Sequence, residues 1–186
     1  LVVDFDVHHG NGTQEVFYAD PDVLVVTSQQ YPLWPGTGGI AETGVGEGAG
    51  ATVNLPLPAG TDDALVDLYR RVLPPLAERH RPEVVFVSAG YDAHHRDPLG
   101  GLGLSVAGFA DLTRLLLEVA DRHADGRLVA ALEGGYDTDA LAYGVAATVR
   151  VMDDPTADVD DPFGPAPAPG PSLQPLEEAV CALHAL

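Results

Sequence analysis

The 186-residue sequence has no lysine, only one cysteine and little positive charge. Its nine basic residues are all arginine and are outnumbered by 28 acidic ones, so the formal net charge is −19 at pH 7. A nucleic-acid partner would require a basic stripe, which this composition excludes. Cys181 alone cannot form an internal disulfide, which fits the reducing cytoplasm. No apolar run approaches the roughly 20 residues that span a bilayer, so no membrane partner is expected.

Short apolar runs alternate with longer amphipathic segments along most of the chain. The runs that predict buried strands, all rich in valine or leucine, are Leu1–Val7, Val23–Thr27, Val84–Ala89 and Leu128–Leu132. The segments with apolar residues at helical spacing are Thr61–Arg81, Ser105–His123 and Thr138–Met152. Strands that alternate with helices predict an α/β fold with a parallel sheet, whose binding sites lie at the carboxyl ends of the strands.

Two other segments lack this alternation. Residues 31–50 contain seven glycines without periodicity, which is typical of a binding loop and equally of a plain surface loop. Residues 153–172 are rich in aspartate and proline and predict a semi-rigid linker. Residues 173–186 then predict a short helix that packs back on the domain. The expected organisation is a domain over 1–152, a linker over 153–172 and a C-terminal helix over 173–186.

Polar side chains gather at the ends of three predicted strands. Asp4, Asp6 and His8 stand at alternate positions of an apolar strand, so they leave it on the same face. Asp92 follows the third predicted strand, and Tyr136 follows a Gly-Gly turn after the fourth. The carboxyl ends of parallel strands meet at one rim of the sheet. Because buried unpaired charge is very costly, we expect a cation to neutralise these carboxylates.

The spacing of Asp6, His8 and Asp92 predicts a metal site with three protein ligands and an open position, as catalytic sites have. Two carboxylates and one imidazole suit zinc or ferrous iron, and ligand type alone does not choose between them. Such a metal polarises a carbonyl and makes bound water nucleophilic near neutral pH. Tyr136 would donate its hydroxyl hydrogen to the developing oxyanion. The alternative for each isolated residue is an ordinary turn or helix cap.

Together and in this order, these motifs resemble the zinc-dependent histone deacetylase superfamily, which includes class II-like bacterial deacetylases, acetylpolyamine amidohydrolases and acetoin-utilisation proteins. The matching stretches are Asp4–Gln14, Pro35–Gly38, Val53–Pro58, Gly90–Asp92 with Asp97-Pro98, and Glu133–Tyr136. The resemblance implies the parallel-sheet arginase/deacetylase fold and a bacterial, cytoplasmic hydrolase of linear amide C–N bonds. It also implies that Asp6, His8 and Asp92 bind zinc and that Tyr136 stabilises the transition state.

The same resemblance implies a structural potassium ion beside the zinc. Its matching groups are the Asp4 side chain, the carbonyls of Asp6, His8 and Ser28, and the side chain of Thr27. Thr27 stands where the family usually has serine, and it keeps the hydroxyl group.

Four further residues match positions that contact substrate in the family. Trp34 corresponds to an aromatic wall of the acyl-lysine tunnel, although a packed or partly exposed tryptophan is an equal alternative. Leu99 corresponds to a gate position, where polyamine-preferring eukaryotic relatives have an acid. Gly134 and Gly135 form the turn before the tyrosine. The implied partner is an acetylated lysine in a protein or peptide, or an acetylated amine. Nothing in the sequence favours one oligomeric state.

Family members place a tandem His-His pair, which acts on the zinc-bound water, before the Asp-x-Asp-x-His strand, and this sequence begins at that strand. We therefore expect the C-terminal portion of a catalytic domain, with the N-terminal part missing, and an isolated chain that binds metal weakly and is essentially inactive. For His9 we expect a structural hydrogen bond. His94 and His95 are expected either to be exposed to solvent or to contact the metal ligands without binding the metal. The alternatives are an acetylpolyamine or other small-amide hydrolase, a catalytically silent acyl-binding module and an arginase-like dinuclear manganese hydrolase.

Overall fold

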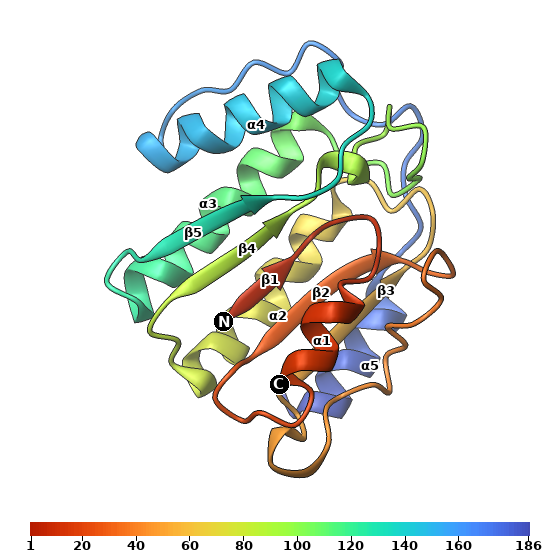
Figure 1. Cartoon of the computed structure of the whole chain (residues 1–186). Coiled ribbons are helices and arrows are strands. Elements are labelled where there is room, and N and C mark those ends of the chain that lie inside the picture. Colours follow the sequence, from red (N-terminus) through yellow and green to blue (C-terminus); the bar gives the residue numbers. More distant parts are fainter.

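The computed structural model describes all 186 residues, and its centre is a parallel sheet of five strands (Figure 1). The strands are β1 (Val2–Asp4), β2 (Val25–Gln30), β3 (Thr52–Leu57), β4 (Val85–Ala89) and β5 (Leu128–Leu132). Their order is β3-β2-β1-β4-β5, and each neighbouring pair is parallel. The chain therefore adds β2 and β3 on one side of β1, and then adds β4 and β5 on the other side of β1. This change of direction places a crevice between the carboxyl ends of β1 and β4, where ligands bind in open α/β sheets.

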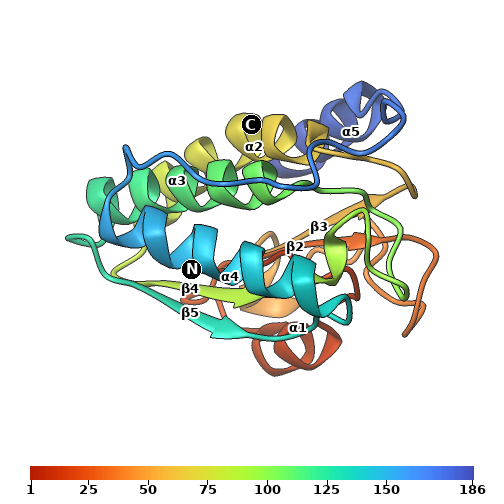
Figure 2. The same ribbon diagram turned by 90° about the horizontal axis from the view of Figure 1, so that it is seen from above.

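Five α-helices surround the sheet. They are α1 (Asn11–Phe17), α2 (Ala64–His80), α3 (Val106–His123), α4 (Thr138–Asp153) and α5 (Gln174–His184). Figure 2 shows α2, α3 and α5 together on one side of the sheet and α1 on the other, while α4 packs along α3. The three long predicted helices are confirmed to within three residues at their starts. The start at Ser105 is fixed because its side chain accepts a hydrogen bond from the amide of Gly108.

The main hydrophobic core lies between the sheet and the α2–α3 layer. The strand predicted over Leu1–Val7 is shorter in the structure, since β1 ends at Asp4, but the predicted alternation of buried residues continues past its end: Val3, Phe5 and Val7 are at most 1% exposed. Phe5 packs against the rings of Tyr91 and Phe109, with centroids 6.1 and 5.7 Å away. This packing fixes the start of the chain, and with it the polar residues that alternate with the apolar ones.

Three elements differ from the expectation. The strand β3 was not predicted, because Asn54 and Pro56 interrupt its apolar pattern; an edge strand tolerates proline since its outer side needs no ladder bond. Helix α1 has only seven residues, too few for a helical period to be recognised. β5 was predicted to be a buried strand, but it is exposed in the sheet that these 186 residues form. β5 forms the other edge of the sheet, and Val129 and Leu132 are 52% and 62% exposed.

Residues 154–172, which we call the C-terminal strap, run from α4 across the start of α3 to α5 (Figure 2). The guanidinium group of Arg114 donates hydrogen bonds to the carbonyls of Pro155 and Ala157. Further along, the amide of Gly170 donates to the carboxylate of Asp62. The strap is thus attached to the α/β body along its length. None of the helices combines the length and apolar character that crossing a membrane requires.

Candidate metal centre

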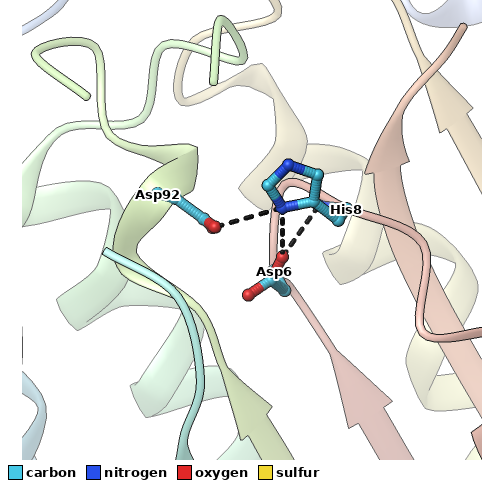
Figure 3. A group of neighbouring side chains, drawn as sticks. All are labelled: Asp6, His8 and Asp92. Carbon is cyan, nitrogen blue, oxygen red and sulfur yellow. Dashed lines mark hydrogen bonds and ion pairs between the residues drawn. The ribbon is translucent and has the colours of Figure 1, made fainter. Parts of the chain in front are cut away.

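The crevice between β1 and β4 brings the predicted ligands together. Asp6 and His8 follow β1, and Asp92 lies in the 3₁₀ turn Tyr91–Ala93 directly after β4. One ligand atom from each of the three lies within 4.8 Å of the others. Figure 3 shows both carboxylates directed toward the His8 imidazole from opposite sides of the crevice. The sequence thus predicted the correct cluster, because parallel strands share one carboxyl rim.

Backbone amides hold the two carboxylates in place. Asp6 accepts hydrogen bonds from the amides of His8, at 2.8 Å, and Gly134, at 3.0 Å, while Asp92 Oδ1 accepts one from Val7 at 2.9 Å. His8 Nδ1 lies 3.1 Å from Asp6 Oδ1 and 3.3 Å from Asp92 Oδ2. The Oδ2 atom of Asp92 is fully buried and has no hydrogen-bond partner. A buried carboxylate oxygen without a donor points to a cation, since leaving such an atom unsatisfied is costly.

Two glycines form a tight cradle around these side chains. A Cβ atom on Gly90 would overlap the Asp6 side chain, and one on Gly134 would overlap the carboxylate of Asp92. Only glycine allows the backbone to approach so closely. Gly135 has a φ of +142°, which also favours glycine. The cradle leaves the side chains of Asp6, His8 and Asp92 as the groups that converge at this point.

The electrostatics of the site favour bound positive charge. Burial, together with the neighbouring Asp6 carboxylate, raises the pKa of Asp92. Burial likewise raises the pKa of Asp4 to about 8, with a smaller contribution from Asp6. Desolvation and like charges both disfavour the ionised carboxylate, and a divalent ion reverses both effects. The residues present therefore fit a zinc ion, with two carboxylates, one imidazole and room for a further ligand.

Tyr136 lies on the turn after β5, and its side chain is 53% exposed. Its amide donates a 2.7 Å hydrogen bond to Asp97 Oδ2, which also accepts from the amide of Asp137 at 3.2 Å. Asp97 Oδ1 accepts from the amide of Leu99. Asp97 thus joins the loop after β4 to the turn that carries Tyr136. Sequence reasoning assigned Asp97 no role, although the Asp97-Pro98 motif marked the position.

The sequence profile of the histone deacetylase domain matches residues 1–152. The chain belongs to the histone deacetylase family. It is 45% identical over 166 residues to the chloroplastic histone deacetylase 10 of Oryza sativa subsp. japonica. The aligned region covers 87% of this chain and 38% of the relative. It is 40% identical over 162 residues to human histone deacetylase 9. Here the aligned region covers 82% of this chain and 16% of the relative. The chain thus spans well under half the length of these relatives.

Solved structures of the family have the same fold. The crystal structure of the HDA15 HD domain superposes with a TM-score of 0.84 at 31% identity, covering 98% of this chain and 49% of that one. The histone deacetylase Clr3 gives a TM-score of 0.86 at 33% identity, covering 99% of this chain and 31% of that one. The predicted parallel-sheet deacetylase fold is confirmed, and the chain corresponds to part of the domain in these proteins.

The residues expected at the potassium site lie on the neighbouring strands β1 and β2. Asp4 and Thr27 are register partners on β1 and β2, so their side chains leave the sheet on the same face. The hydroxyl of Thr27 donates to Gln29 Oε1, at 3.2 Å. On the other face, the Tyr69 hydroxyl is 3.2 Å from the Asp4 carbonyl and 3.0 Å from Ser28 Oγ. Tyr69 is a buried neighbour of this site that sequence reasoning missed.

The residues matched to substrate contacts lie on the surface. Trp34 is 78% exposed and Leu99 is 55% exposed. Trp34 is therefore not packed in this structure, and its exposure agrees with the alternative of an exposed tryptophan, while its role as a tunnel wall stays a prediction. Gly134 lies directly against the carboxylate cluster, as described above, and Gly135 follows it.

His9 makes the structural hydrogen bonds that were predicted for it. Its Nδ1 lies 2.8 Å from Thr37 Oγ1, and its Nε2 lies 3.1 Å from Gln14 Oε1. Gln14 in turn donates to Glu42 Oε2 at 2.6 Å, and Glu42 accepts from the amides of residues 38 and 39. Burial lowers the pKa of His9, which favours the neutral ring. This network ties the glycine-rich loop of residues 31–50 to the turn after β1.

The second histidine pair, His94 and His95, faces the strap. The two rings stack with centroids 4.3 Å apart, and His95 Nε2 lies 3.1 Å from the carbonyl of Gly164. His94 is completely buried, so a solvated place is the wrong prediction for it. Burial, reinforced by the neighbouring His95, lowers the pKa of His94 to about 4. His94 is thus an uncharged packing residue next to the loop that carries Asp92.

Proposed function

We propose that this protein is a zinc-dependent deacetylase that hydrolyses the acetamide of acetylated lysine. In this proposal Asp6, His8 and Asp92 hold the metal. The observation that carries it is the convergence of their ligand atoms within 4.8 Å of one another, with the buried Oδ2 of Asp92 left without a hydrogen-bond partner. Membership of the histone deacetylase family supports deacetylation as the chemistry.

A bound zinc ion supplies Lewis acidity, polarising the acetamide carbonyl and lowering the pKa of water. The protein's part is to fix the geometry: the amides of Val7 and Gly134 orient the carboxylates of Asp92 and Asp6. The Tyr136 hydroxyl donates a hydrogen bond to the carbonyl oxygen as negative charge develops there. Loss of such a donor lowers kcat by roughly 100- to 1000-fold.

None of the three histidines His8, His9 and His94 is placed to act as general base in the proposed reaction. His8 is needed on the metal, both ring nitrogens of His9 contact neighbouring side chains, and His94 is buried beside the strap. We propose that the acid–base groups lie in residues that these 186 do not include, as the 38% coverage of the rice relative allows. The 186-residue chain alone is then expected to be essentially inactive.

The finer features of the function form part of the same proposal. They are a potassium ion at Asp4, Thr27 and Ser28, and substrate contacts from Trp34 and Leu99. The form of Asp4–Gln14 and the single cysteine support a bacterial, cytoplasmic protein. The net charge of −19 gives some support to an acetylated polyamine as a second substrate class, because an acidic field attracts cations.

Zinc binding by the 186-residue chain tests the metal centre directly. Competition with a chromophoric chelator should reveal one zinc site, and Asp92→Asn should weaken it by at least about tenfold, because it removes a charged ligand. Asp20→Asn is the matched control, since the side chain of the half-buried Asp20 accepts a hydrogen bond only within its own turn, from the amide of Asp22. Equal zinc affinity in the parent chain and in Asp92→Asn would contradict the proposed ligand set.

Turnover separates the candidate functions. In a longer form of the protein that includes the acid–base groups, acetyl-lysine peptide and an acetylated polyamine are offered in competition, and release of acetate is measured. We expect preference for the peptide, because Leu99 offers no carboxylate to a second amine. Preference for the polyamine favours the small-amide alternative, and binding without turnover favours the silent acyl-binding module. If the 186-residue chain alone releases acetate, the proposal that the acid–base groups lie outside it is contradicted.

A further inference from the structure

Phe163 of the C-terminal strap lies between the loop after β4 and helix α4. Its ring meets Tyr143 of α4 edge-on, with centroids 5.5 Å apart, and His94 of the loop, with centroids 5.6 Å apart. The Cζ atom of Arg96 lies over the same ring, 4.4 Å from its centroid. This is the geometry of a cation–π interaction. One side chain of the strap therefore contacts helix α4, which follows the turn bearing Tyr136. It also contacts the loop after β4, whose Asp97 accepts a hydrogen bond from that turn.

Arg96 continues this contact toward Tyr136. Its Nε donates a 3.2 Å hydrogen bond to Asp137 Oδ2, and Asp137 is the next residue after Tyr136. The other oxygen of Asp137 accepts from the amide of Ala140 at 2.9 Å and so caps α4. Asp137 is held from both sides, by the start of α4 and by Arg96. The position of the Arg96 guanidinium group therefore affects the turn that carries the proposed oxyanion donor.

The strap holds Phe163 firmly at this place. Asp161 Oδ1 accepts hydrogen bonds from the amides of Phe163, at 3.1 Å, and Gly164, at 2.9 Å, while its Oδ2 accepts from Ala107 at the start of α3, at 3.1 Å. Val159 and Phe163 both pack against the small apolar cluster between α3 and α4, but only Phe163 also has its ring beneath the Arg96 guanidinium group. Phe163 is thus fixed to the body by contacts that do not involve Arg96. It also lies outside residues 1–152, which match the family profile.

We propose that Phe163 is a positioning residue for Tyr136: its ring holds the Arg96 guanidinium group against Asp137 and so restrains the turn Gly134–Asp137. The inference rests on the oxyanion role proposed for Tyr136, because restraining this turn matters for the reaction only if that hydroxyl takes part. The direct partners are Phe163 and Arg96, and neither touches the reacting atoms. The strap therefore acts on the geometry of the site and not on metal binding.

Amide hydrogen exchange on the 186-residue chain tests the restraint without any need for activity. Phe163→Leu keeps an apolar side chain but removes the aromatic face, and it should raise the exchange rates of the amides of Tyr136 and Asp137 by roughly two- to fivefold. Phe163→Tyr should restore the parent rates. Val159→Ala is the matched control, because it loosens the strap without touching Arg96, and it should leave these two amides unchanged.

Kinetics supply the second readout. In an active longer form, Phe163→Leu should lower kcat by a similar roughly two- to fivefold factor with KM and zinc affinity unchanged. Unchanged exchange in Phe163→Leu, or an equal effect of Val159→Ala, would overturn the proposal. So would altered exchange with an unchanged kcat in an enzyme that depends on Tyr136. If the unaltered longer form does not deacetylate, the proposed function is contradicted. The exchange comparison then still decides whether Phe163 restrains the turn.

Discussion

Asp97 offers the sharpest test of how the site is held together. Its carboxylate accepts three backbone hydrogen bonds, from Leu99 at 2.9 Å, Tyr136 at 2.7 Å and Asp137 at 3.2 Å, and the residue is only 7% exposed. In Asp97→Asn one carboxylate oxygen becomes an NH₂ group. That group is itself a donor, so at least one backbone N–H loses its acceptor and faces another donor.

The cost follows from the energies of such bonds. A hydrogen bond to a charged group contributes about 1.5–3 kcal/mol, and an unsatisfied buried donor adds to its loss. Loss of one such bond and weakening of the others should lower the free energy of unfolding by about 2–4 kcal/mol. For a chain of this size, that corresponds to a fall in Tm of roughly 5–15 °C.

The assay is urea and thermal unfolding followed by circular dichroism, with a chelator present so that bound metal does not add stability. Asp20→Asn serves as the control, because the side chain of the half-buried Asp20 accepts only one hydrogen bond, from the amide of Asp22, and the change should alter stability by less than about 0.5 kcal/mol. If Asp97→Asn lies within about 1 kcal/mol of the parent, the carboxylate does not hold the loop after β4 to the Tyr136 turn.

Two further predictions address packing and pH. Gly134→Ala should weaken zinc binding and destabilise the fold by about 1–3 kcal/mol, because its Cβ would overlap the Asp92 carboxylate. The control is Gly12→Ala, in α1, where the added methyl has open space around it; it should be neutral or stabilising by up to about 1 kcal/mol. If both substitutions change the free energy of unfolding and the zinc affinity equally, Gly134 does not form a cradle for the carboxylates. Burial, and then the nearby Arg79 charge, lower the pKa of His184 below its usual 6.5. The unfolded chain therefore takes up this proton first, so stability falls as pH drops below about 6.5, and His184→Gln should flatten that slope in unfolding curves measured between pH 5 and 8.

The convergence of Asp6, His8 and Asp92 could be predicted from sequence because it depends on local rules. Alternation fixes which side chains of the first strand share a face, and a parallel sheet brings strand ends to one rim. Asp6, His8 and Asp92 follow from these two facts, although 84 residues separate His8 from Asp92. The change of direction between β1 and β4 was not needed to name the ligands. It explains why a crevice lies there.

The residues that hold the centre in place could not be predicted in the same way. Asp97 acts on Tyr136 from 39 positions away, and Tyr69 reaches the Asp4 carbonyl from 65 positions away. Neither pair follows a period or a spacing rule, since each depends on how loops and helices pack in three dimensions. The strap is a similar case: its composition predicts a linker, whereas the paired contacts of Asp161 and Phe163 attach it to the body.

The strand β5 shows what composition alone leaves open. Its sequence, Leu128–Leu132, is entirely apolar, and such a run predicts a strand covered on both faces. Apolar composition identifies a strand, but the number of its neighbours depends on strand order, and the order β3-β2-β1-β4-β5 places this one at the edge. The same edge position leads the chain directly into the Gly134–Asp137 turn. The amides of Tyr136 and Asp137 donate to Asp97, and the Asp137 carboxylate accepts from Arg96, so the position of the turn depends on these side chains and substitutions there should reach Tyr136.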